Sequence, residues 1–147
     1  MGTPRKILLA SHSPTCTTGY GRVTRRLAHA FGKAGHAVAV VGMSFRGGPH
    51  ELPFRIFPWQ SRRPGESFVA ACRQFRPNVL LSIGDPWMFE FLPGLAERRL
   101  ATWVAYFPVD GRPLLLEWKP WIAAVDVPPV LSRALTGGAL WATGNRR

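Results

Sequence analysis

The residues best suited to ligand chemistry stand in residues 11–36, which read SHSPTCTTGYGRVTRRLAHAFGKAGH. A short apolar segment enters a loop rich in Ser and Thr, and Gly19 and Gly21 stand one residue apart before an Arg-rich helical pattern. Bare backbone N–H groups of a glycine loop at a helix N-terminus can hold phosphate or sugar hydroxyls. The pattern predicts a ligand-binding loop, and the alternative is that the glycines only permit the turn.

The spacing of this loop differs from the commonest phosphate-binding fingerprints. A G-x-G-x-x-G loop needs a third glycine, where this chain has Thr24. It also needs a carboxylate at the end of the second strand, where Gly42, Met43 and Ser44 follow one another. No G-x-x-x-x-G-K sequence is present. The loop is therefore neither a dinucleotide fingerprint nor a P-loop.

Histidines and cysteines show no spacing typical of a metal site. The four histidines are spread out without an H-x-x-x-H pair, and the two cysteines, Cys16 and Cys72, are far apart in the sequence. Cys72 lies on an apolar helical face beside Phe68, Ala71 and Phe75, which indicates a small buried hydrophobe. We expect no metal, no cofactor and no disulfide.

The elements that must position the glycine loop alternate between apolar strands and amphipathic helices. The hydrophobic periodicity and turn residues predict strands over residues 6–10, 36–43, 54–57, 78–84, 101–107 and 127–131. They predict helices over residues 20–34, 64–75, 85–99 and 114–125. Thr18 and Asp85 are the expected N-caps and Gly35 a C-terminal cap, and the third helix is expected to be broken or kinked at Pro93.

This alternation predicts an α/β fold. We expect a doubly wound, mostly parallel Rossmann-like sheet of about six strands with the first strand central. Residues 1–133 form a single domain in this prediction, and residues 134–147 are an irregular or frayed C-terminal tail.

Ligands of doubly wound proteins bind beyond the carboxyl ends of the strands. The loops expected there cover residues 11–21, 43–48, 84–85 and 108–111, and three of them contain glycine beside polar or acidic residues. Nearby tryptophans are either core residues or platforms that stack on sugars, and the sequence leaves both open for Trp87, Trp103, Trp118 and Trp121.

Composition and charge limit the classes of protein to which this chain can belong. The 147 residues are 46% hydrophobic, which indicates a globular domain rather than disorder. No apolar run approaches the roughly 20 residues of a membrane helix, and the N-terminus lacks the pattern of a signal peptide, so we expect a cytoplasmic protein. The net charge of +11 permits an anionic partner, but the arginines are scattered and no basic tail indicates nucleic acid.

The order of four segments carries a family resemblance. KILLASHSP, TGYGRVTRRLAHAFGKAGHAVAVVG, VLLSIGDPW and WVAYFPVDG resemble, together, the N-terminal half of a GT-B glycosyltransferase of the family 4 type. The similarity covers residues 5–133. The family's fold implies two Rossmann-like halves that face each other across a cleft. The N-terminal half mainly binds the acceptor, and the C-terminal half binds the nucleotide-sugar donor.

The resemblance also implies roles for particular residues. Gly19 and Gly21 match the loop whose backbone approaches the donor phosphates and the acceptor, so a side chain at Gly21 is expected to block that approach. Asp110 lies near the place where many relatives carry a His or a His-Asp pair, and it is the predicted catalytic residue although this chain has no His there. The predicted substrate-binding residues are Thr18, Gly19, Tyr20, Gly21, Asp85 and Tyr106.

The sequence departs from the family in length. The donor-binding half, with its basic phosphate-binding residues and paired glutamates, has no counterpart in these 147 residues. The resemblance therefore implies the acceptor half of a truncated or split glycosyltransferase, inactive alone, with a nucleotide-sugar as co-substrate. Its expected partners are a sugar or glycan acceptor, a separate donor-binding domain or a second copy, and weakly an anionic membrane surface. The alternative is a non-enzymatic basic domain that binds anionic lipid or, less expectedly, nucleic acid.

Overall fold

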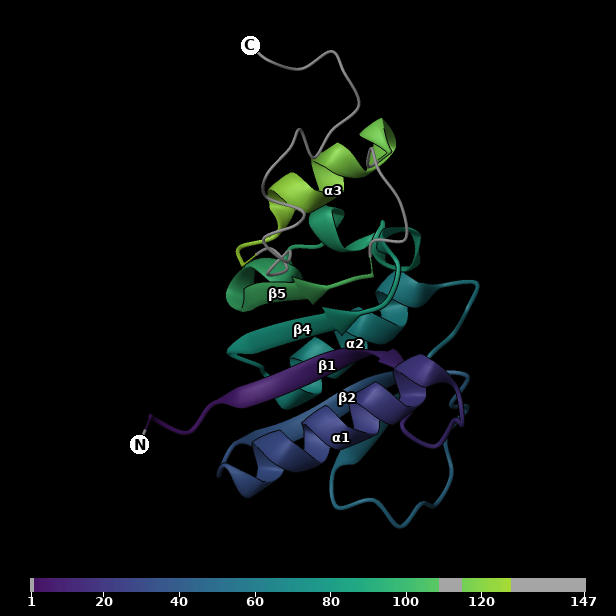
Figure 1. Cartoon of the computed structure of the whole chain (residues 1–147), viewed down its shortest axis with the longest axis vertical. Helices are drawn as coiled ribbons and strands as arrows, with labels where there is room; N and C mark the ends of the chain where they lie inside the picture. Colours follow the sequence, from purple (N-terminus) through teal and green to yellow (C-terminus); the bar gives the residue numbers. More distant parts are fainter. Residues whose placement is uncertain (1, 109–114, 128–147) are drawn as a thin grey trace.

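The chain folds around one parallel β-sheet, and the computed structural model describes residues 2–108 and 115–127 of it (Figure 1). The five strands lie in the order β3-β2-β1-β4-β5, with every neighbouring pair parallel. Their bounds are β1 Lys6–His12, β2 Ala37–Met43, β3 Arg55–Pro58, β4 Val79–Ile83 and β5 Thr102–Tyr106. The predicted α/β fold with a parallel sheet and a central first strand is confirmed.

The sheet has five strands within the described residues, against about six predicted. At the expected place of the sixth strand, Val127 forms a single parallel bridge with Val104 of β5. The remainder of that prediction, residues 128–131, and the predicted tail over residues 134–147 lie outside the described residues. No helix of the described part of the chain is long and apolar enough to span a membrane.

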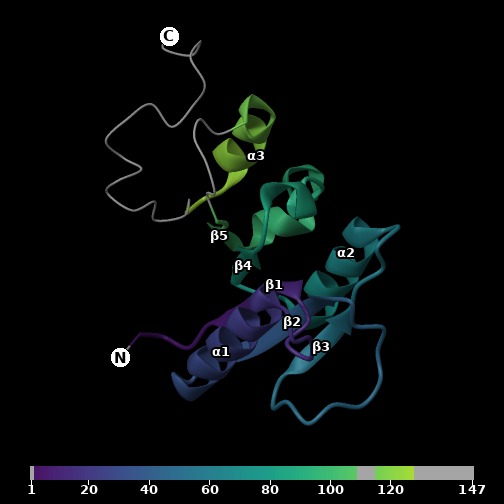
Figure 2. The ribbon, with the colours of Figure 1, turned by 45° about the vertical axis from the view of Figure 1, so that its right-hand side comes forward.

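Each face of the sheet carries its own hydrophobic core. Leu8 and Ala10 of β1 belong to the cluster that contains Phe68 of helix α2 (Pro64–Phe75). The alternate residues Ile7 and Leu9 belong to the cluster that contains Ala28 of helix α1 (Gly19–Lys33). Because successive side chains of a strand point to opposite faces, α1 and α2 cover opposite faces, as Figure 2 shows.

Both long helices form where the local sequence predicts them. The Thr18 hydroxyl accepts a hydrogen bond from the Gly21 N–H at 3.1 Å and caps α1, which ends just before Gly35 at φ +87°. Helix α2 covers the predicted residues 64–75, with Pro64 at its start. Its Cys72 is buried, and burial together with nearby Glu97 raises the pKa of the thiol to about 12. This thiol stays neutral, as expected for a core residue.

The predicted helix over residues 85–99 is wrong. Three short 3-10 helices occupy this stretch: η1 Pro86–Phe89, η2 Leu92–Gly94 and η3 Glu97–Leu100. Pro93 cannot donate a backbone hydrogen bond, and its ring clashes with the preceding helical turn. Burial of Met88, Phe89 and Leu92 in the α2-side core then holds the broken chain against the sheet.

The predicted helix over residues 114–125 is replaced by two short elements. The 3-10 helix η4 (Leu116–Trp118) leads into α3 (Lys119–Ala124), and residue 114 lies outside the described residues. Helix α3 packs its Trp121 against Trp103 of β5, with ring centroids 5.2 Å apart and the rings nearly perpendicular. The Trp121 indole N–H donates to the Phe89 carbonyl at 3.0 Å. This tryptophan is therefore a core residue that attaches α3 to the sheet.

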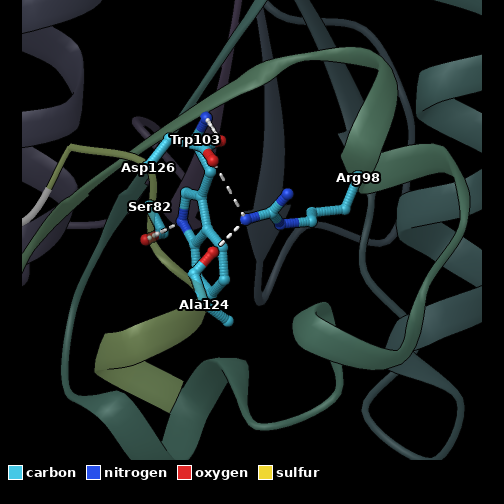
Figure 3. Close-up of polar contacts among 5 residues, drawn as sticks. All are labelled: Ser82, Arg98, Trp103, Ala124 and Asp126. Carbon is cyan, nitrogen blue, oxygen red and sulfur yellow. Dashed lines mark hydrogen bonds and ion pairs between the residues drawn. The ribbon is translucent and has the colours of Figure 1, made fainter. Parts of the chain in front are cut away.

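Arg98 contacts β5 as well as α3 and Asp126, which follows α3 (Figure 3). Its guanidinium donates to the Ala124 carbonyl, lies 3.6 Å from Asp126 Oδ1, and stands 5.1 Å from the centre of the Trp103 ring. Asp126 Oδ2 in turn accepts from the Trp103 backbone N–H at 2.8 Å, and the Trp103 indole donates to Ser82 Oγ at 2.9 Å. Arg98 thus contacts both β5 and the end of α3, and Trp103 extends this group of contacts to Ser82 of β4.

We predict that Arg98→Ala lowers the free energy of unfolding by about 2–3 kcal/mol, because a charge-assisted hydrogen bond and a cation–π contact are lost together. The ion pair itself contributes little of this, since Asp126 is 45% exposed. Urea unfolding measures the change. Arg99→Ala, at an adjacent exposed arginine, is the control and should stay within about 0.5 kcal/mol of the wild type. Equal effects of the two substitutions would contradict the prediction.

Candidate functional site

The sheet topology opens a crevice at the carboxyl end of β1. From β1 the chain passes through α1 to β2 on one side, whereas β4, on the other side, is reached from α2. The connections that follow β1 and β4 therefore leave toward opposite faces of the sheet, which is where α/β proteins bind ligands. Thr18, Gly84 and Asp85 belong to these two connections.

A cleft of about 500 Å³ lies at this edge. It collects residues that follow four strands of the sheet. Its described lining consists of His12, Met43, Ser44, Trp59, Ser61, Pro64, Trp87, Met88, Glu90 and Phe91. The lining is aromatic and polar, and it contains no lysine or arginine among the described residues. We call it the carboxyl-edge cleft.

Two tryptophans give this cleft its aromatic character. Trp87 is 63% exposed, and Trp59 is held edge-on against Phe91 at a centroid distance of 5.7 Å. Trp103 and Trp121 are buried core residues instead. An exposed indole next to polar side chains can stack on the apolar face of a sugar ring while its neighbours bind hydroxyls. Of the tryptophans that the sequence leaves open, Trp87 therefore has the position of a platform.

Three of the predicted site residues are connected through His12 and Tyr20: Thr18 and Tyr20 contact His12, and Asp85 contacts Tyr20. The Tyr20 hydroxyl donates to Asp85 Oδ1 at 3.2 Å, and the Tyr20 ring stands edge-on to His12 at 5.6 Å. The Thr18 hydroxyl lies 2.9 Å from His12 Nδ1. Since Thr18 Oγ1 already accepts from Gly21, it can donate its proton to Nδ1, and in that tautomer the Nε2 of His12 is the donor.

The two glycines of the loop differ in what surrounds them. Gly21 is buried, and a Cβ there would stand 2.7 Å from the Cys16 carbonyl oxygen and 2.8 Å from that of Ser13. Gly19 is exposed, with no atom within 4 Å of an added Cβ. The loop's own packing thus requires glycine at residue 21, which supports the turn-forming alternative for Gly21, and binding by either backbone stays a prediction.

The turn after β4 also depends on a glycine. Gly84 has φ +147°, and a Cβ there would stand 2.8 Å from Met88 Sδ. Asp85 follows as the N-cap residue of η1, as predicted, and its carbonyl accepts from the Met88 N–H at 3.0 Å. Its carboxylate nevertheless remains directed to Tyr20. Asp85 is thus both the N-cap residue of η1 and a residue at the crevice.

Two further predicted site residues, Tyr106 and Asp110, do not belong to this group. Tyr106 ends β5 and is 54% exposed, but it is not among the described lining residues of the carboxyl-edge cleft. Asp110, the predicted catalytic residue, lies outside the described residues. Both assignments stay predictions. Within the described part of the chain, no group of His, Cys, Asp or Glu is arranged to hold a metal ion.

The cleft also contains residues that sequence reasoning missed. His12, Ser44, Trp59 and Glu90 line it although no motif marks them. Ser44 adopts φ +68°, a left-handed conformation that is uncommon for serine. The sequence offered no signal for these residues except their position, because His12, Ser44 and Trp59 stand at or just after the end of a strand.

Comparison with known proteins adds no family assignment: no protein-family model matches the chain, and no curated protein is significantly similar to it in sequence.

We predict that Gly21→Ala lowers the free energy of unfolding by about 1–3 kcal/mol, because the new Cβ must displace two backbone carbonyls. Gly19→Ala is the matched control. It should be neutral or stabilise the fold by up to about 1 kcal/mol, since α1 begins there with open space around the Cα. Thermal unfolding compares the two. If Gly21→Ala left the free energy of unfolding unchanged, the loop would tolerate a side chain at residue 21. A role of Gly21 in ligand binding alone would then again be the favoured interpretation.

Proposed function

We propose that the chain is the acceptor-binding half of a nucleotide-sugar-dependent glycosyltransferase. The observation that carries this proposal is the carboxyl-edge cleft, which combines the exposed Trp87 with the neighbouring group of His12, Tyr20 and Asp85. Stacking and hydroxyl recognition are the two interactions that bind a neutral sugar. The family resemblance of the sequence independently points to the same half of the same enzyme class.

In this proposal the acceptor sugar lies across the cleft. Its apolar face stacks on Trp87, and Trp59 closes the wall behind it. His12 Nε2 donates to one hydroxyl while the Asp85 carboxylate, oriented by the Tyr20 hydroxyl, accepts from another. Holding the acceptor in one orientation is a substantial part of the catalysis of transfer, because it removes rotational freedom before the reaction.

The donor requires groups that the cleft does not offer. Departure of a nucleoside diphosphate needs positioned cations or N–H donors for its developing negative charge. The described cleft lining contains no lysine or arginine. The backbone N–H of Gly19 could supply only part of the N–H donors that the leaving group requires. We therefore assign the donor site to a separate half that closes over this edge, and Asp110 stays the proposed catalytic residue. A doubly wound sheet with its sixth strand over residues 127–131 is part of the same proposal.

We predict that at least one methyl glycoside of glucose, galactose, mannose or N-acetylglucosamine binds the chain at millimolar concentration. Saturation-transfer difference NMR measures the dissociation constant. Trp87→Ala should weaken binding about fivefold through lost stacking, whereas Trp118→Ala, outside the cleft, should leave it unchanged. Binding should also be nearly constant between about 50 and 200 mM salt, in contrast to binding of a phosphate backbone. A preference for sugar phosphates over neutral glycosides would contradict the assignment.

We predict further that the chain alone releases no nucleoside diphosphate from UDP-glucose, UDP-N-acetylglucosamine or GDP-mannose, with or without the glycoside that binds. The reason is that the described lining of the cleft lacks cations that could stabilise the charge of the leaving group. A coupled nucleoside diphosphate assay measures release against an Asp110→Ala control. Release above that control would show that these 147 residues hold a complete active site.

A further inference from the structure

Helix α1 carries a row of basic side chains on the side that faces away from the sheet. Arg22, Arg25, Arg26, His29 and Lys33 follow one another at helical spacing, and the helix contains no Asp or Glu. The row extends over about 16 Å at 1.5 Å per residue. We call these five residues the α1 stripe.

The charge of the α1 stripe is exposed and unneutralised. Its three arginines and Lys33 are exposed, and His29 is half-buried. The ion pairs within the described part of the chain all lie elsewhere, at Arg63–Glu66, Arg73–Glu97 and Arg98–Asp126. A hollow of about 440 Å³ runs along the stripe and is lined by it together with Ala30. A partner with several negative charges therefore fits this surface by charge complementarity.

A second hollow gives the same surface an apolar part. It measures about 660 Å³ and shares His29 and Lys33 with the first. Two further basic groups, His36 and Arg55, stand beside apolar residues in its lining, which includes Ala28, Val38, Pro53, Phe54 and Phe75. Cations around an apolar hollow suit an amphipathic anion, with its charge on the rim and its hydrocarbon in the hollow.

From these two features we infer that the α1 stripe docks the protein on a bilayer containing anionic phospholipid. A single-stranded nucleic acid would need exposed aromatic rings for stacking, whereas Phe54, which packs edge-on against His29, is a residue that is only 8% exposed. A nucleic-acid duplex would use the cations but not the apolar hollow. The bilayer uses both, and each basic residue near an anionic surface strengthens binding about fivefold.

The α1 stripe and the carboxyl-edge cleft share no described lining residue, although the first turn of α1 places Tyr20 next to His12 of the cleft. Met88 of the cleft belongs to the α2-side core, whereas α1 covers the opposite face of the sheet. The inference goes beyond the proposed function and does not depend on it.

Sedimentation with lipid vesicles tests the inference on the whole chain. Vesicles of phosphatidylcholine alone are compared with vesicles containing 30% phosphatidylglycerol, at about 50 and 300 mM salt. The test variant is Arg22→Gln/Arg25→Gln/Arg26→Gln, in which Gln preserves helix propensity. The matched control is Arg46→Gln/Arg62→Gln/Arg99→Gln, which removes the same charge from exposed arginines outside α1. Circular dichroism verifies that both variants fold.

The expected result is binding to the anionic vesicles only, with a partition coefficient of about 10³ M⁻¹ at low salt. The α1 variant should lose about a hundredfold, because three of the contributing cations are gone, and the control should lose at most a few-fold. Equal losses in both variants would overturn the inference, since they would reflect net charge alone. So would absence of binding by the wild type, or tighter binding to a 20-base-pair DNA duplex than to the vesicles at the same salt.

Discussion

The parallel pairing of β1 on both of its edges is the constraint on which the rest of the structure depends. β1 pairs over its whole length with β2 and over four residues with β4, and Leu8, Leu9 and Ala10 are completely buried. Its alternate side chains enter the two cores that hold α1 and α2 to opposite faces. Because the chain turns away from β1 on one side and returns on the other, the crevice at its carboxyl end is a consequence of this pairing.

Close backbone packing then gives the crevice its shape. Gly42 lets the chain after β1 cross β2, since a Cβ there would stand 3.0 Å from Ser13 Cβ and from Ile56 Cγ2. Gly21 admits the Cys16 and Ser13 carbonyls, and Gly84 takes a backbone conformation that other residues avoid. Gly21 and Gly84 each stand next to a residue of the hydrogen-bonded pair Tyr20 and Asp85. Stability and site geometry are therefore coupled at this edge, so activity measurements on loop variants need a stability measurement beside them.

Charge divides the surface into two regions of different chemistry. The carboxyl-edge cleft combines tryptophan, serine, histidine and glutamate without a described lysine or arginine. The α1 stripe holds adjacent cations without a carboxylate on the same helix. This difference is the basis for proposing a neutral, hydroxyl-rich ligand for the first region and an extended anionic surface for the second. The net charge of +11 alone could not separate these two cases, because it gives the sum of the charges and not their position.

The sequence by itself determined the elements that depend on local interactions. Helices α1 and α2 lie within a residue of prediction, because the Thr18 cap, Gly35 and Pro64 act on their own neighbours. Tertiary structure decided the stretch from Asp85 to Leu100, where the burial of Met88, Phe89 and Leu92 outweighs helical periodicity interrupted by Pro93. It also decided the site. His12, Trp59 and Trp87 are distant in sequence, and they line one cleft only because strand order brings the carboxyl ends of β1, β3 and β4 to one edge.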